Sequence, residues 1–270
     1  MKGIRALPLI PLALGELCCS SYRACEPPAA RTELSMAPAD AAPPRRDEPD
    51  PIGPVRTVDV PVPGDLPAVV VRGAREHRKT MLFIPGMCAH PGGYVMSFQH
   101  AAAARGELVA VQGDVSCGGD GAMRRWSYDL EAMNRRIEAA FAAAGLGEPR
   151  DVIVIGYSQG AERAEKLVAR WPAKYSRAIL IASPIAPSPQ LLRHSAGVAL
   201  MAGTYDMSQA AMRGAVAPLE RAGVSAAYFP IPNARHGQMG DTPEETMRRA
   251  LDFVEHTVRT KRLDAGAPAR

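Results

Sequence analysis

The sequence predicts an α/β protein with three layers, in which a mostly parallel sheet carries helices on both faces. Two observations predict this class. From about residue 80 onward, short apolar segments alternate with helical patterns, and two further strand patterns come before this alternation. Strand–helix alternation is typical of parallel sheets, because a helix usually makes the crossover between parallel strands. In open sheets of this kind, sites form at the carboxyl ends of the strands.

Each element is expected from its own pattern. Strand patterns, either alternating or continuously apolar, occupy 55–60, 68–71, 80–84, 108–111, 151–155, 178–181, 198–201 and 226–229. The clearest is Asp-Val-Ile-Val-Ile at 151–155. Helical patterns occupy 94–104, 127–144, 159–170, 208–222 and 242–259. Within 127–144, Leu130, Met133, Ile137 and Phe141 recur at helical spacing, which predicts one buried face.

Residues 1–25 have the layout of a secretory signal peptide. Lys2 and Arg5 form a short positive region, an apolar run follows at 6–14, and small residues follow at 18–20. This order predicts an exported protein in the periplasm, at the cell surface or secreted. The run is too short and too interrupted by proline to be a membrane-spanning helix. Cysteines at 18 and 19 leave a lipid anchor as an alternative, and a disordered tail is another.

Residues 26–54 differ in composition from the rest of the chain. Eight of these 29 residues are proline and six are alanine. Such a segment buries too little apolar surface to offset the entropy lost on ordering. The composition predicts a disordered linker, followed by one folded domain at 55–270.

Composition and charge exclude several classes of protein. Hydrophobic residues make up 47% of the chain and charged residues 22%, which excludes collagen-like, wholly disordered and multi-span membrane proteins. The net charge is +4 and both signs are interspersed, so nucleic-acid binding has little support. His, Cys and carboxylate residues show no metal-ligand spacing, and we expect no metal and no cofactor. The oligomeric state is not predicted.

The segment after the clearest strand carries the chemistry. It reads Gly156-Tyr157-Ser158-Gln159-Gly160, a Gly-x-Ser-x-Gly pattern between a strand and a helix. In this context the turn is so tight that Gly156 and Gly160 have no room for side chains, and the serine hydroxyl stands above the sheet. The pattern predicts that Ser158 is a nucleophile, whereas an ordinary glycine-rich turn is the alternative.

A serine nucleophile needs a base and an acid that orients the base. In this architecture they follow in the order serine, acid, histidine. Asp206 comes just after the strand at 198–201, and His236 lies on the loop after the last strand. We therefore expect Asp206 to orient His236, although Asp206 could instead cap the next helix. His90 precedes the serine and is better interpreted as a pocket residue.

The tetrahedral intermediate of acyl transfer needs two backbone donors at its negative oxygen. The N–H of Gln159, directly after the serine, is the first candidate. The N–H of Met87, in the turn Pro85-Gly86-Met87 after the third strand, is the second. An ordinary strand-end turn is the alternative.

These motifs together resemble the α/β-hydrolase superfamily over roughly residues 55–260. The resemblance rests on Phe83-Ile84-Pro85-Gly86-Met87, Gly156-Tyr157-Ser158-Gln159-Gly160, Tyr205-Asp206 and Arg235-His236-Gly237. It implies an eight-stranded, mostly parallel sheet and a catalytic triad of Ser158, Asp206 and His236. The layout is similar to that of serine esterases and dienelactone hydrolases. Only 182–196 is available for a lid, so we expect no cap domain and an open site shaped by loops 86–94, 113–126 and 182–195.

The resemblance implies a serine hydrolase that cleaves small carboxylic esters or thioesters through an acyl-enzyme. A peptidase or acyltransferase could use the same residues, and a binding protein could keep the fold without activity. Cys88 and Cys117 follow the third and fourth strands, which are neighbours in this fold. They could form a disulfide in an exported protein, or could remain two free thiols.

Overall fold

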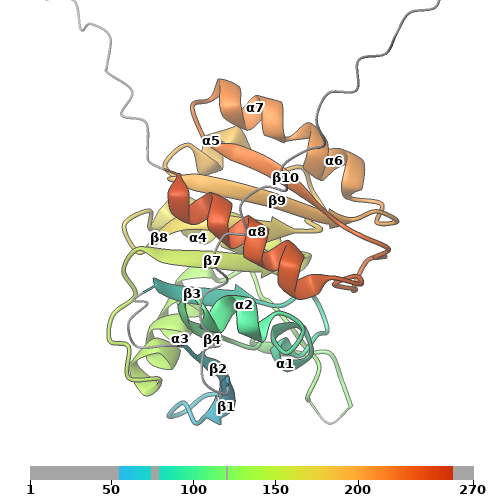
Figure 1. Ribbon diagram of the computed structural model, residues 1–270. Coiled ribbons are helices and arrows are strands. Elements are labelled where there is room, and N and C mark those ends of the chain that lie inside the picture. Colours follow the sequence, from blue (N-terminus) through green and yellow to red (C-terminus); the bar gives the residue numbers. More distant parts are fainter. Residues whose placement is uncertain (1–54, 74–78, 120, 258–270) are drawn as a thin grey trace, which may run out of the picture. The chain divides into compact units, whose positions relative to one another are not determined.

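The computed structural model describes residues 55–73, 79–119 and 121–257 (Figure 1). The predicted signal peptide at 1–25 and the predicted linker at 26–54 lie outside the described residues. Within the described residues, no helix is both long enough and apolar enough to cross a membrane.

An eight-stranded sheet forms the centre of the described domain. Its order is β1-β2-β4-β3-β7-β8-β9-β10. β2 pairs antiparallel with β1 and with β4, and the other neighbours pair in parallel. The strands are β1 (Arg56–Val60), β2 (Ala68–Arg72), β3 (Lys79–Ile84), β4 (Gly106–Ala110), β7 (Val152–Tyr157), β8 (Tyr175–Ile181), β9 (Gly197–Gly203) and β10 (Ala226–Ile231). The predicted eight-stranded, mostly parallel sheet is confirmed, and all eight strand patterns correspond to strands.

Helices cover both faces of this sheet, which confirms the three-layer class (Figure 1). One face packs against α3 (Leu130–Ala143), α4 (Gln159–Arg170), α5 (Pro189–Leu192), α6 (Gln209–Gly214) and α7 (Val216–Arg221). The other packs against α1 (Pro91–Val95), α2 (Gln99–Ala103) and α8 (Pro243–His256). Alternate residues of a strand pack into the cores on opposite faces of the sheet. In β3, Leu82 packs on the side of α3 and α4, and Phe83 packs on the side of α2 and α8. Period-2 alternation in a fully buried strand has this consequence.

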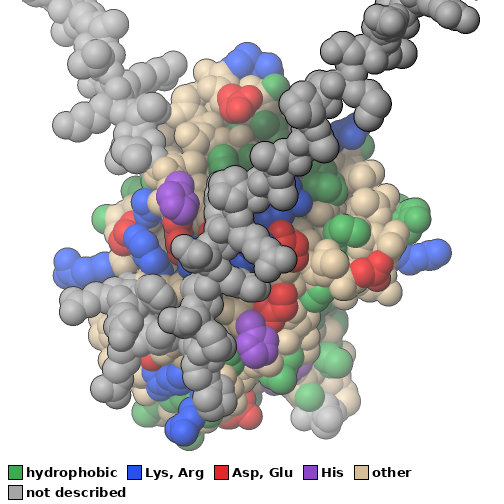
Figure 2. Space-filling model, viewed as in Figure 1, with side chains coloured by type: hydrophobic (Ala, Val, Ile, Leu, Met, Phe, Trp, Pro, Cys, Tyr) green, Lys and Arg blue, Asp and Glu red, His purple; other side chains and the backbone are tan. Residues whose placement is uncertain are grey.

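Charged side chains of both signs are interspersed on the face of the molecule that carries α8 (Figure 2). Two arginines pair with carboxylates there. Arg105, which follows α2, pairs with Asp252 and Glu255 of α8, and Arg248 pairs with Glu245 one turn earlier. The pairs made by Arg105 join α8 to the end of α2 on this side of the sheet.

Two segments that were each predicted as one helix contain two shorter helices, so these predictions are wrong in this respect. The segment 94–104 contains the end of α1 and then α2, and between the two helices the Ser97 hydroxyl donates to the Tyr94 carbonyl at 2.6 Å. The segment 208–222 is divided at Ala215 into α6 and α7. Pro218 explains this break, since a proline lacks an N–H and clashes with the carbonyl four residues earlier.

A small second sheet is a feature that the sequence patterns do not predict. β5 (Val115–Ser116) and β6 (Arg124–Arg125) pair antiparallel, within a segment that the sequence predicts as a loop. The N–H of Ala89 donates to the carbonyl of Arg124 at 3.2 Å, so the β3–α1 loop continues this pairing. The loop after β4 is therefore joined to the loop after β3.

Candidate active site

Ser158 lies at the carboxyl end of β7, on the turn into α4, with φ 52° and ψ −118°. This backbone conformation is rarely adopted by a residue with a side chain. The two glycines of the motif have no space for a methyl group. A Cβ on Gly156 would lie 2.4 Å from the carbonyl oxygen of Gly160, and one on Gly160 would lie 2.1 Å from that of Ile84. The steric reason for both glycines thus holds in the structure.

His236 and Asp206 form a hydrogen-bonded row with Ser158. Nε2 of His236 lies 3.0 Å from Oγ of Ser158, and its Nδ1 lies 2.9 Å from Oδ2 of Asp206. An ionised carboxylate has no proton to donate, so Nδ1 carries the hydrogen and Nε2 is free to accept from the serine. The structure brings together all three residues that the sequence indicated, from the ends of β7, β9 and β10.

The side chains of Asp206 and His236 differ in their burial. The Asp206 side chain is 2% exposed, whereas that of His236 is 50% exposed. The second oxygen of Asp206 accepts from both the N–H and the hydroxyl of Ser208, each at 2.8 Å. The N-cap of α6 is Ser208, so Asp206 does not cap this helix as the alternative interpretation required, and its two oxygens contact Ser208 and His236 instead. A buried, fully hydrogen-bonded carboxylate is suited to holding an imidazole in one orientation.

The loop that carries His236 is fixed at several points. The N–H of Gly237 donates to the Tyr157 hydroxyl at 2.7 Å, and the N–H of Arg235 donates to the Gln238 side chain at 2.9 Å. Asn233, with φ 53°, donates from its side chain to Asp241 at 2.6 Å. Burial raises the pKa of Tyr157, so this hydroxyl stays protonated. The imidazole is thus presented by a loop with little freedom.

The turn with Met87 lies directly beside the serine. A Cβ on Gly86 would lie 3.2 Å from Cβ of Ser158. Within 55–73, 79–119 and 121–257, the N–H groups of Met87 and Gln159 have no hydrogen-bond partner. Gln159 also begins α4, whose helix dipole favours negative charge at this end. Both predicted donors are therefore next to the serine and are available to an acceptor.

A cavity of about 750 Å³ adjoins these residues. Its walls come from the segments 88–97 and 233–243, with Met123 between them. Ser158 is not part of its lining, but the lining includes Cys88, which follows Met87, and Gly237, which follows His236. His90 lines it as expected, but the segment 182–195 does not. The segment 233–243 lines the cavity instead. The sequence does not predict this, because no pattern in it indicates how the loop before α8 folds.

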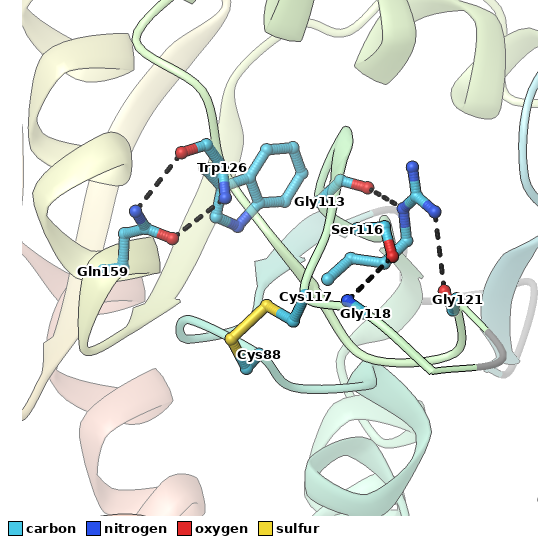
Figure 3. Close-up of a disulfide and its surroundings, with 9 residues drawn as sticks. Cys88, Gly113, Ser116, Cys117, Gly118, Gly121, Trp126 and Gln159 are labelled. Carbon is cyan, nitrogen blue, oxygen red and sulfur yellow. Dashed lines mark hydrogen bonds between the residues drawn. A yellow bond between two sulfur atoms is a disulfide. The ribbon is translucent and has the colours of Figure 1, made fainter.

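The β3–α1 loop is braced by a disulfide between Cys88 and Cys117 (Figure 3). Their Cα atoms are 5.7 Å apart, and they lie 29 positions apart in the sequence. Of the two alternatives that the sequence left open, the structure has the paired form. The disulfide joins the residue after Met87 to the loop after β4, next to the β5–β6 pair.

Among the described residues, no group of three or more His, Cys, Asp or Glu side chains could hold a metal ion. Sequence reasoning missed one residue at the site, Trp126. Its indole N–H donates to the Pro85 carbonyl at 3.0 Å, and its backbone contacts the Gln159 side chain. No local pattern distinguishes this tryptophan from any other buried aromatic residue.

Comparisons with solved structures identify the fold. The chain is similar to a predicted CIB-like hydrolase from Thermoplasma acidophilum, at 16% identity and a TM-score of 0.56 over 74% of this chain and 98% of that one. It is similar to carboxylesterase CesB (YbfK) from Bacillus subtilis at 13% identity and 0.55, over 74% and 92%, and to esterase PE8 at 19% and 0.54, over 68% and 97%. No family model and no curated protein sequence matches the chain. The chain has the α/β-hydrolase fold.

Proposed function

We propose that this protein is a serine hydrolase that cleaves carboxylic esters, or thioesters, through an acyl-enzyme intermediate. The hydrogen-bonded row of Ser158, His236 and Asp206 carries the proposal, because it provides a nucleophile, a base and an orienting acid at the required distances. The similarity in fold to enzymes named as esterases supports ester substrates.

In the first half-reaction, Oγ of Ser158 attacks the substrate carbonyl carbon while Nε2 of His236 takes the hydroxyl proton. The charge on the carbonyl oxygen is stabilised by the N–H groups of Met87 and Gln159, each of which contributes roughly 3–4 kcal/mol in comparable sites. The carbon–oxygen bond to the alcohol then breaks, and His236 returns its proton to the leaving group. Asp206 keeps the imidazole oriented and stabilises its cationic form.

In the second half-reaction, a water molecule attacks the ester between the acyl group and Ser158. His236 takes a proton from this water and then delivers it to Oγ as the acid is released. The half-exposed imidazole is accessible to that water, since no cap domain covers it among the described residues. The cavity between the segments 88–97 and 233–243 is of a size that accommodates a small organic molecule.

Hydrolysis of p-nitrophenyl acetate and butyrate by the full chain tests the proposal. We expect turnover by the wild type and a loss of at least about 10³-fold in kcat for Ser158→Ala. Equal fold content of the two proteins, measured by circular dichroism, is the control. Equal rates for the wild type and Ser158→Ala would overturn the proposed role of the triad. A wild type that neither hydrolyses these esters nor reacts with a fluorophosphonate would favour a binding protein.

We also propose that the protein is exported. The layout of residues 1–25 and the Cys88–Cys117 disulfide support this, since disulfides persist mainly in oxidising compartments. Cell fractionation of the full chain and of a form lacking residues 2–25 tests it. Cytoplasmic location of the full chain would contradict the proposal.

A further inference from the structure

The two proposed oxyanion donors come from segments that are far apart in the chain. Met87 follows β3, whereas Gln159 begins α4. Two donors stabilise one oxygen only when both lie about 3 Å from it, so an error of about 0.5 Å in their relative position matters. The disulfide at Cys88 fixes one of these segments to the loop after β4 but does not reach Gln159.

Trp126 connects the two segments through three hydrogen bonds. Oε1 of Gln159 accepts from the Trp126 backbone N–H at 2.9 Å, and Nε2 of Gln159 donates to the Trp126 carbonyl at 3.2 Å (Figure 3). The indole N–H of Trp126 donates to the carbonyl of Pro85 at 3.0 Å. The connection therefore runs from the residue after the nucleophile to a residue two positions before Met87.

Trp126 is buried, so a loss of any of these hydrogen bonds would be costly. Its side chain belongs to the core and is 2% exposed. In a buried site, a donor or acceptor that loses its partner is not compensated by water. The guanidinium of Arg136 lies 5.8 Å from the centre of its ring, and Arg163 of α4 donates to the carbonyl of the next residue, Ser127, at 3.1 Å. The tryptophan is thus held on several sides.

The chemistry of the two side chains suits this task. A primary amide offers an acceptor oxygen and a donor NH2 group, which match the N–H and the carbonyl of Trp126. An ionised carboxylate in the same place would accept from the N–H but would also face the Trp126 carbonyl with a second negative oxygen. Indole is the aromatic side chain that fills the core and donates a hydrogen bond without accepting one.

We propose that Trp126 and the side chain of Gln159 are positioning residues that hold the Met87 and Gln159 N–H groups in register for the oxyanion. This inference rests on the proposed function and adds a role for the Gln159 side chain to that of its backbone. The oxyanion exists only in the transition state and the intermediate. A loosened connection should therefore lower kcat and leave KM nearly unchanged.

The first test removes the indole N–H and keeps an aromatic ring in the core. We expect Trp126→Phe, which loses the indole N–H, to lower kcat about 10-fold or more with KM within about twofold. Trp171→Phe is the matched control, because it makes the same replacement at the other tryptophan, at the far end of α4. The control should keep the wild-type kcat, and equal kcat values for Trp126→Phe and wild type would overturn the proposal.

The second test changes the amide itself. In Gln159→Met, a side chain of similar length replaces the amide and can neither accept from the Trp126 N–H nor donate to its carbonyl. We expect this variant to lower kcat about 10-fold or more with KM within about twofold. In Gln159→Glu, the ionised carboxylate still accepts from the Trp126 N–H but repels its carbonyl, so we expect kcat below that of the wild type from about pH 5.5 to about pH 8.

A wild-type kcat for Gln159→Met would overturn the positioning role, even if Trp126→Phe fails to fold. Failure of the proposed function gives a different result, because the wild type would then lack both ester hydrolysis and fluorophosphonate labelling, and both proposals would fall. An active wild type with unaffected variants would overturn the positioning role alone.

Discussion

Asp206 accepts a hydrogen bond from Nδ1 of His236 at 2.9 Å while its side chain is almost completely buried. This contact fixes which ring nitrogen carries the proton. In Asp206→Asn, the new amide can donate to Nδ1 and so favours the tautomer with its hydrogen on Nε2, which cannot accept from Ser158. We expect kcat for p-nitrophenyl butyrate to fall about 10³- to 10⁴-fold, as in comparable triads.

The amide oxygen of Asp206→Asn can still accept from Ser208, so the turn after β9 should survive. Unchanged thermal unfolding of this variant is the control. A kcat within about tenfold of the wild type would contradict the role proposed for Asp206.

The turn around Ser158 allows a prediction about stability. Gly160→Ala would place a methyl group 2.1 Å from the carbonyl oxygen of Ile84, which belongs to the buried strand β3. We expect a loss of more than about 2 kcal/mol in the free energy of unfolding, measured by urea denaturation. Gly214→Ala is the matched control, since a Cβ on this helical glycine meets nothing within 4 Å. It should change stability little or raise it by up to about 1 kcal/mol.

The parts of the fold that the sequence predicted are those fixed by local pattern. Val152–Tyr157 is a continuously apolar strand, and Gly156 and Gly160 are dictated by a turn whose steric demands are local. The three side chains of the candidate site were found because the fold imposes their chain order. The two proposed oxyanion donors were predicted from the turns that they occupy, one directly after the serine and one after the third strand.

The parts that were missed depend on contacts that no periodic pattern encodes. Trp126 reaches Pro85 and Gln159 across 41 and 33 positions, and neither separation has a sequence pattern. The cavity wall at 233–243 depends on the contact between Asn233 and Asp241 within a loop. The break between α1 and α2 lies at Ser97, whose hydroxyl bonds to the Tyr94 carbonyl, and periodicity does not detect such a contact.

The disulfide provides a prediction that combines stability and rate. Cys88 has φ 53° and follows Met87 directly, so the bridge to Cys117 holds a strained residue beside a proposed oxyanion donor. For a loop of this length we expect reduction to cost about 2–4 kcal/mol of unfolding free energy. We also expect kcat to fall several-fold under dithiothreitol, with Ser158 still labelled by a fluorophosphonate.

Cys88→Ser/Cys117→Ser should reproduce the reduced protein and should not respond further to dithiothreitol. The chain has three other cysteines, at 18, 19 and 25, so this double variant attributes the effect to the correct pair. Identical unfolding curves with and without reductant for the wild type would contradict the prediction, provided that mass spectrometry detects the Cys88–Cys117 peptide pair before reduction.

The last prediction concerns Glu165, a carboxyl of α4 that is 1% exposed and accepts a hydrogen bond from the Ser188 N–H. Burial raises its pKa to about 7, and the nearby Glu162 contributes in the same direction, while the Ser188 N–H opposes the shift. The folded protein therefore holds a proton on Glu165 that the unfolded chain has lost above about pH 4.5. The contribution of Glu165 to the free energy of unfolding is therefore largest below about pH 4.5, decreases as the pH rises toward 7, and is constant at higher pH.

Glu165→Gln keeps an acceptor for Ser188 and removes the titration. Relative to the wild type, we expect the free energy of unfolding of this variant to increase between about pH 5 and about pH 8 by an amount on the order of 3 kcal/mol at most. Urea denaturation of both proteins at several pH values measures the difference, in which the effects of the other carboxylates cancel. A difference that is constant across this range would mean that Glu165 is ionised in the folded protein throughout.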